Sequence, residues 1–163
     1  GEWFCQIQGT AMGTKFAPSY AGLFMGWFEK CYAWDPVAGK WTQHIHFWGQ
    51  FLDDILIVWT GPGGEVLDYL EYLNSNDLNV SFTVKVNENE IDFLDIKLYV
   101  MDNKIQSKLF RKNTATNSTL RADSAHPKSV IKGIPYGEMV RIRRNCSEEQ
   151  QYEENLIHLK QRL

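Results

Sequence analysis

Two adjacent carboxylates near the middle of the sequence restrict how this chain can fold. Asp53 and Asp54 separate residues 41–50, an aromatic run with β-strand character, from residues 55–59, which are all apolar. The second run is typical of a strand that is buried on both faces. We therefore expect the two runs to pair as a hairpin that carries both carboxylates at its tip.

These two carboxylates would repel each other unless a cation lay beside them. Mg²⁺ suits such a position because it prefers hard oxygen ligands and needs only one or two protein carboxylates plus substrate phosphates. In two-metal phosphoryl transfer, one ion activates the attacking oxygen and the other stabilises the leaving group. Asp53 and Asp54 are therefore a candidate catalytic metal site, and an ordinary Asp-rich hairpin turn is the alternative.

A glycine-rich segment precedes the first predicted helix. Gly9 and Gly13 stand four residues apart, and Pro18 fits the first turn of a helix over 17–32, where apolar residues recur at helical spacing. Glycines in this position let the backbone approach a planar or phosphorylated ligand closely. Such loops are common, so turn geometry alone is the simpler explanation of these two glycines.

The remaining elements predict an α+β fold with an antiparallel sheet and helices on one of its faces, because helices alternate with runs of strands. The strands after the hairpin would form a meander of residues 80–86, 91–100 and 104–111. The other predicted elements are a helix at 66–73, a polar loop at 113–124, a helix at 137–144 and a long polar helix at 147–163.

The last predicted helix opens on Ser147 and Gln150, which have the spacing of a capping box. In that motif, the two side chains satisfy backbone N–H groups at the start of the helix. No glycine-bearing turn separates two clearly amphipathic helices in this section, so we do not expect it to read a specific DNA sequence.

Charge is distributed unevenly along the chain. The net charge of −3 combines −9 over residues 1–103, with 5 Lys and Arg against 14 Asp and Glu, and +6 over residues 104–163, with 12 against 6. Such asymmetry suggests that one part meets a polyanion while the other concentrates carboxylates. A solvated charged face is the alternative reading.

Two further features bear on compartment and partners. The three cysteines are far apart and odd in number, which argues against a disulfide framework and for a reducing compartment. The longest largely apolar stretch, residues 16–28, is interrupted by Pro18 and is too short to span a bilayer. We therefore expect no membrane partner.

The order of these motifs resembles the palm of reverse transcriptases, in particular the version found in Penelope-like retroelements. Gln8-Gly9-x-x-x-Gly13-x-x-x-Ala17-Pro18 precedes a helix, and Phe51-x-Asp53-Asp54 follows in a hairpin. The resemblance runs in order from about Cys5 to Ser147. Several short motifs make the resemblance specific to Penelope-like elements. They are Gly9 to Thr14 with Tyr20-Ala21, Phe93-Leu94-Asp95, Arg111-Lys112 with Thr114-Ala115 and Asn117-Ser118, His126-Pro127, Ile134-Pro135-x-Gly137, and Arg141 to Ser147.

The resemblance implies a fold and an activity. A reverse-transcriptase palm would occupy residues 1–112, a polar linker 113–125, and a thumb-like or helix-turn-helix-like region 126–163. The activity would be RNA-directed DNA polymerisation by two-metal nucleotidyl transfer, with an RNA template, a DNA primer and deoxynucleotide triphosphates as partners. An intracellular and nuclear location would follow.

The resemblance also implies roles for individual residues. Asp53 would bind Mg²⁺ directly, and Asp54 would help to shape the site. Phe51 would pack beside the primer end. The pocket for the incoming nucleotide and the templating base would include Gln8, Gly9 and Gly13, and the phosphates of the template–primer duplex would contact Arg111, Lys112, Arg141, Arg143 and Arg144.

The first palm motif, which holds the other metal-binding aspartate in this family, is expected upstream of Gln8. The two-metal site would then be incomplete in this chain, and we expect the fragment to be inactive alone. Two further hypotheses are a non-catalytic nucleic-acid-binding remnant and a decayed element copy.

Overall fold

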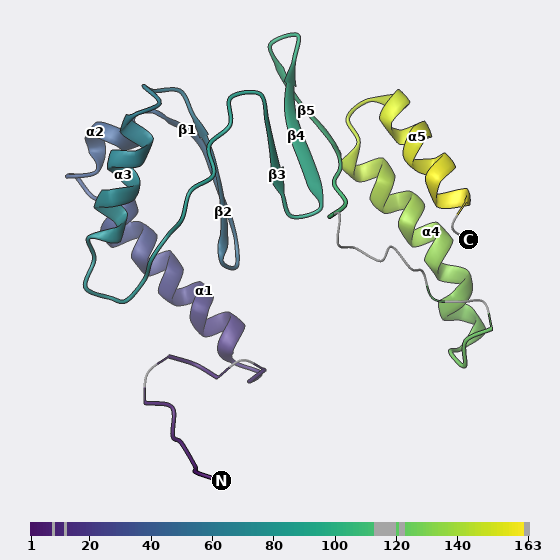
Figure 1. Cartoon of the computed structure of the whole chain (residues 1–163), viewed down its shortest axis with the longest axis horizontal. Helices are drawn as coiled ribbons and strands as arrows, with labels where there is room; N and C mark the ends of the chain where they lie inside the picture. Colours follow the sequence, from purple (N-terminus) through teal and green to yellow (C-terminus); the bar gives the residue numbers. More distant parts are fainter. Residues whose placement is uncertain (8, 12, 113–119, 121–122, 162–163) are drawn as a thin grey trace. The chain divides into compact units, whose positions relative to one another are not determined.

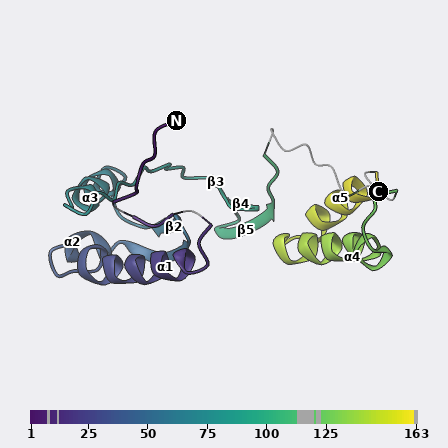
Figure 2. The ribbon, with the colours of Figure 1, turned by 90° about the horizontal axis from the view of Figure 1, so that it is seen from below.

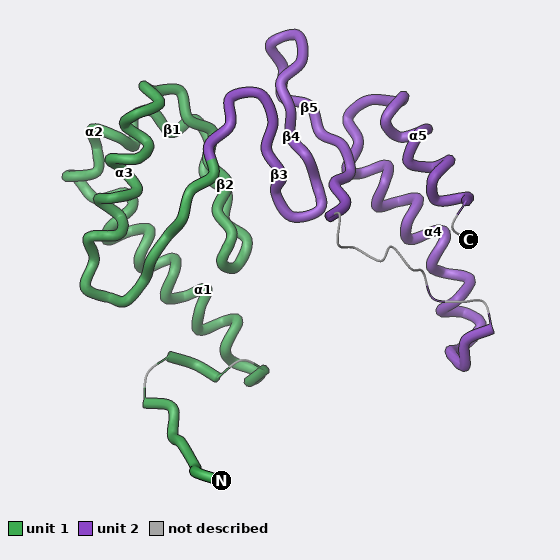
Figure 3. The backbone as a smooth tube through the Cα atoms, in the orientation of Figure 1, with its two compact units in different colours: residues 1–85 green, residues 86–163 purple. Residues whose placement is uncertain are grey.

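The computed structural model describes residues 1–7, 9–11, 13–112, 120 and 123–161 (Figure 1). The fold is α+β, with small antiparallel sheets and five α-helices in the described part of the chain. Contacts divide the chain into two compact units, residues 1–85 and residues 86–163 (Figure 3). The division at 113–125 that the resemblance implies stays a prediction, because most of that segment lies outside the described residues.

The first unit contains the predicted first helix, hairpin and second helix. Its elements are α1 (Ala17–Phe28), a π-helical turn η1 (Glu29–Ala33), α2 (Gly39–Thr42), β1 (Ile45–Phe51), β2 (Asp54–Trp59) and α3 (Glu65–Asn74). A proline lies in the first turn of α1, as predicted. The strand predicted from residue 41 is wrong at its start, because Trp41 belongs to α2. A carboxylate oxygen of Asp35 accepts a hydrogen bond from the Ala38 N–H at 2.6 Å in the turn that leads into α2.

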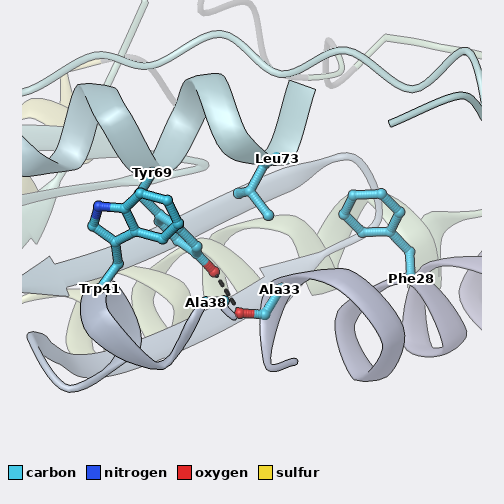
Figure 4. Close-up of a cluster of buried hydrophobic side chains, with 6 residues drawn as sticks. All are labelled: Phe28, Ala33, Ala38, Trp41, Tyr69 and Leu73. Atoms are coloured by element: carbon cyan, nitrogen blue, oxygen red, sulfur yellow. Dashed lines mark hydrogen bonds between the residues drawn. The ribbon is translucent and has the colours of Figure 1, made fainter. Parts of the chain in front are cut away.

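The core of the first unit lies between α3 and the segment from the end of α1 to α2, which form separate layers in Figure 2. The Tyr69 hydroxyl is buried there and donates a hydrogen bond to the Ala33 carbonyl at 2.8 Å (Figure 4). This bond ties α3 to the end of the π-helical turn. The buried residues of the core are Phe28, Ala33, Ala38, Trp41, Tyr69 and Leu73.

Alkaline pH should destabilise the first unit through Tyr72. Burial, followed by the hydrogen bond that its hydroxyl donates to Asp35 at 2.7 Å, raises the pKa of Tyr72 from 10.0 to about 12. The unfolded chain therefore loses the phenol proton at lower pH than the folded chain, and the stabilisation present below pH 10.0 is lost as pH rises toward about 12. All six tryptophans belong to this unit, so the urea midpoint from tryptophan fluorescence should fall over that range. The fall should be shallower in Tyr72→Phe and unchanged in Tyr20→Phe, whose ring is exposed.

Residues 80–86 do not form the predicted strand. The side-chain amide of Asn74 instead makes both bonds that a neighbouring strand would make to Phe82, donating to its carbonyl at 2.9 Å and accepting from its N–H at 2.7 Å. Asn76 donates to the Val80 carbonyl at 2.8 Å. The alternating apolar residues that suggested a strand are present because Val80 and Phe82 pack against the core of the first unit.

The second unit begins with a three-stranded antiparallel meander in the order β3-β4-β5, formed by β3 (Glu90–Phe93), β4 (Ile96–Met101) and β5 (Lys104–Leu109). The single strand predicted over 91–100 is therefore wrong, since a two-residue turn at Leu94 and Asp95 divides it. Leu94 has a φ of 53°, a left-handed conformation that a leucine rarely adopts, so the sequence carries no turn signal there.

Two helices, α4 (Lys128–Asn145) and α5 (Glu149–Lys160), complete the second unit and lie side by side in Figures 1 and 2. Ile142, Cys146 and Leu159 are buried between them, and Leu109 of β5 packs against this cluster. The helix predicted at 137–144 starts earlier, at Lys128, and continues through Pro135. The connection between α4 and α5 spans three residues and contains no glycine.

The predicted capping box is wrong, because Ser147 bonds to a strand. Its hydroxyl accepts a hydrogen bond from the Ser107 N–H at 2.8 Å and donates one to the Ser107 carbonyl at 3.2 Å. The backbone N–H of Ser147 donates to the same carbonyl at 2.9 Å. Glu148 is the N-cap of α5, and no side chain caps this helix. Ser147 therefore joins the start of α5 to β5.

Replacing Ser147 by alanine should destabilise the second unit by about 1–2 kcal/mol, because two hydrogen bonds of modest net value are lost. Urea unfolding followed by circular dichroism measures this loss. Ser129→Ala on the exposed surface of α4 is the matched control and should stay within about 0.5 kcal/mol of the unchanged protein. Equal stability of the two variants would contradict the assigned role of Ser147.

Candidate metal-binding hairpin and nucleic-acid interface

The β1–β2 hairpin exposes the two carboxylates, as the sequence predicted. Phe51 pairs with Asp54 across the hairpin, which leaves Leu52 and Asp53 as its two-residue turn. Asp53 and Asp54 are both exposed, and their carboxylates make no hydrogen bond or ion pair with any residue that the structure describes. Nothing on the described surface therefore neutralises this pair of charges.

The hairpin turn is held in an unusual backbone conformation. Leu52 has a φ of 53°, which costs a non-glycine residue about 1–2 kcal/mol. The side-chain amide of Gln50 donates a hydrogen bond to the Leu52 carbonyl at 2.7 Å and braces the turn. Phe51 and Leu52 are 54% and 60% exposed, so apolar side chains flank the carboxylates. The bracing role of Gln50 carries no sequence signal, because an amide at a strand end is unremarkable.

The donor set of the hairpin fits part of a magnesium site. Two carboxylates are enough for one Mg²⁺ that also takes water and phosphate oxygens. The described residues contain no cluster of three or more His, Cys, Asp or Glu side chains that could hold a metal ion. The hairpin therefore offers two protein ligands, and a two-ion site would need more.

Two glycines of the glycine-rich segment adopt backbone conformations with positive φ. Gly9 and Gly13 have φ values of 78° and 89°, which favour glycine over any other residue. Thr14 closes a turn shortly before α1, since its N–H and its hydroxyl both donate to the Ala11 carbonyl, at 3.4 and 3.1 Å. Gln8 lies outside the described residues. No hydrogen bond joins the described part of this segment to the hairpin carboxylates.

Arg141 and Arg143, which are among the predicted phosphate contacts, form ion pairs inside the second unit. Arg141 forms ion pairs with Asp95 at 2.8 Å and with Glu138 at 3.5 Å. Arg143 pairs with Glu149 at 2.6 Å and lies over the Tyr152 ring. These partners come from the β3–β4 turn, α4 and α5.

The other three predicted contacts differ in exposure. Lys112 and Arg144 are exposed, and Arg111 is half-buried. Two further exposed cations, Lys128 and Lys132, lie four residues apart on α4 and were not among the predicted contacts, because the helix predicted from residue 137 did not include them. The exposed cations of the second unit therefore include Lys128 and Lys132 in addition to members of the predicted set.

A comparison with known protein families finds a match in the second unit. Residues 118–163 match the family model of the animal helix-turn-helix domain, a stretch that contains α4 and α5. No curated protein and no solved structure matches the chain. Among the residues that the structure describes, no helix is long and apolar enough to cross a membrane.

Proposed function

We propose that this chain carries the metal-binding hairpin of an RNA-directed DNA polymerase similar to those of Penelope-like retroelements, followed by a unit that binds nucleic acid. The enzyme would add deoxynucleotides to a DNA primer on an RNA template, and a retroelement enzyme would do so in the nucleus. The ordered motifs from Gln8 to Ser147 support the family, and the match over residues 118–163 supports nucleic-acid binding.

The polymerase proposal rests mainly on the exposed carboxylates of the β1–β2 hairpin. A polymerase site must hold cations against the phosphates of a nucleotide, so its carboxylates must be open to solvent and free of internal cations. Asp53 and Asp54 meet both requirements. The exposed Phe51 ring stands beside them, where it would pack against the primer end. Gly9 and Gly13 would allow the backbone to approach the nucleotide closely.

Asp53 would hold Mg²⁺ directly, and Asp54 would share the site. The bound ion would lower the cost of the negative charge that develops on the transferred phosphoryl group. Two carboxylates do not complete a two-ion site. We therefore propose that the activity needs a further carboxylate from outside this chain, as the family resemblance implies.

A primer-extension assay with Mg²⁺, an RNA template and deoxynucleotides tests this proposal. The chain itself should give no product, and a form that includes its upstream coding sequence should extend the primer. If the longer form is inactive while the chain still binds duplex, the polymerase proposal fails and a non-catalytic nucleic-acid-binding role replaces it. If neither activity nor binding is found, a decayed element copy is the remaining explanation.

The second candidate, binding without catalysis, is favoured by the charge of the second half of the chain and by the family match there. Binding to phosphates weakens steeply with salt because condensed counterions are released. A salt titration of duplex binding by the chain therefore tests this function separately from polymerase activity.

A further inference from the structure

The two helices of the second unit differ in charge. α4 carries five basic side chains and one acid, whereas α5 carries one lysine and three glutamates. A polyanion that approaches this pair would be attracted to α4 and repelled by α5. The charged residues are Lys128, Lys132, Arg141, Arg143, Arg144 and Glu138 on α4, and Glu149, Glu153, Glu154 and Lys160 on α5.

Three of the cations on α4 are available to a ligand. Arg141 and Arg143 are held by carboxylates of the same unit. Lys128, Lys132 and Arg144 are exposed, and none of them pairs with a carboxylate in the described part of the chain. A polyanion would therefore contact these three without first breaking an ion pair.

The available cations lie within one half of the circumference of α4, on an arc that begins close to its buried side. Successive residues turn by about 100° around a helix, so Ile142 marks the buried side and the other residues can be placed relative to it. Glu138, which is half-buried next to Arg141, lies about 40° from Ile142 in one direction, and Lys128 lies about 40° from it in the other. The exposed arc of α4 runs from Lys128 to Gly137 over about half of the circumference, and it contains the available cations and no acid. Its members are Lys128, Ser129, Lys132, Tyr136, Met139, Arg143 and Arg144, together with Gly133 and Gly137.

Part of this arc carries no side chains, because two of its residues are glycines. Gly133 and Gly137 are one turn apart, and a Cβ added to either would meet no atom within 4 Å. Packing inside the unit therefore does not require glycine at these positions, although glycine destabilises a helix interior relative to alanine. Glycine at these two positions leaves the helix backbone open to close approach by another molecule. Tyr136, which is 72% exposed, lies between them along the helix.

We propose that the exposed arc of α4 lies along the phosphate backbone of a nucleic-acid duplex, and that α5 faces away from the duplex. Lys128, Lys132 and Arg144 would neutralise phosphates, and Gly133 and Gly137 would admit the backbone closely. This arrangement differs from the usual helix-turn-helix, in which the second helix enters the major groove. It rests on the nucleic-acid binding proposed above and adds the helix that makes the contact.

Binding of the full chain to a fluorescently labelled RNA–DNA hybrid duplex, measured by anisotropy over a salt series, tests this arrangement. Lys128→Gln with Lys132→Gln should weaken binding roughly 10- to 100-fold at about 0.1 M salt and should reduce the salt slope by about 1.8, since each phosphate contact contributes about 0.9. Lys30→Gln with Lys160→Gln removes the same charge from the first unit and from α5, and should change neither quantity.

Two more variants separate contact from overall charge. Glu153→Gln with Glu154→Gln should leave the affinity unchanged, because α5 faces away from the duplex. Gly133→Ala with Gly137→Ala should raise the melting temperature and yet weaken binding, an outcome that a purely structural role for the glycines does not give.

Equal effects of the two lysine pairs would overturn the arrangement, as would a large gain in affinity from the glutamate variants. A wild-type chain that binds no duplex would refute the proposed nucleic-acid binding itself. A wild-type chain that binds, together with unaffected α4 variants, would refute only the assignment of α4.

Discussion

Replacing Asp53 by asparagine is expected to lower primer extension on an RNA template by about three orders of magnitude in the form of the protein that is active. The amide keeps the size of the side chain but removes the charge that would hold Mg²⁺. A bound metal ion supplies several kcal/mol of transition-state stabilisation, which corresponds to a loss of about 10³-fold. The rate of product formation at saturating deoxynucleotide and Mg²⁺ measures this effect.

Asp102→Asn is the matched control for this change. Asp102 also lies in the two-residue turn of an exposed hairpin, between β4 and β5, and its φ of 51° is one that asparagine adopts readily. The control should retain the activity of the unchanged enzyme, whereas full activity of Asp53→Asn would refute the polymerase assignment. Circular dichroism of both variants checks that each still folds.

Phe28→Ala should destabilise the first unit by about 3–5 kcal/mol, the usual cost of removing a large aromatic side chain from a core. Phe28 is 1% exposed, stacks on Tyr32 with ring centroids 5.0 Å apart, and contacts Phe82 at 5.4 Å. The alanine would leave a cavity where α1 meets the π-helical turn. Urea unfolding followed by tryptophan fluorescence reports this unit alone, because the second unit contains no tryptophan.

Phe16→Ala, at the start of the same helix, removes the same atoms from a residue that is 60% exposed. Its effect should be below about 1 kcal/mol. Similar losses in the two variants would show that Phe28 does not anchor the core. Because the second unit has a separate core around Ile142, circular dichroism should reveal a second transition that neither variant moves.

Elements defined by local patterns could be predicted from the sequence. The apolar spacing and Pro18 indicate α1, and the acid pair between two apolar runs indicates the hairpin and its exposed carboxylates. The strand at 80–86 could not be judged correctly, because the side chain of Asn74 takes the place of a neighbouring strand. A hydrogen-bond partner of this kind leaves no periodic signal.

Long-range contacts account for the other errors. Ser147 has the spacing of a capping box, but its hydroxyl bonds Ser107, which is 40 residues away. The ion pairs of Arg141 and Arg143 could not be predicted either, because their carboxylates come from a turn and a helix that only the fold brings close. Composition identified the basic half of the chain, whereas the availability of each cation depended on its neighbours in space.

The π-helical turn at Glu29–Ala33 limits how the length of the first unit can vary. Such a turn accommodates more residues than an α-helical turn, and its last residue presents the carbonyl that Tyr69 bonds. Loss of one residue here would let α1 continue as a regular helix and would rotate everything after it by about 100°. Ala33 would then face away from Tyr69, so homologous chains that keep this core should tolerate substitutions at the exposed Lys30 and Cys31 but no deletion within residues 29–33.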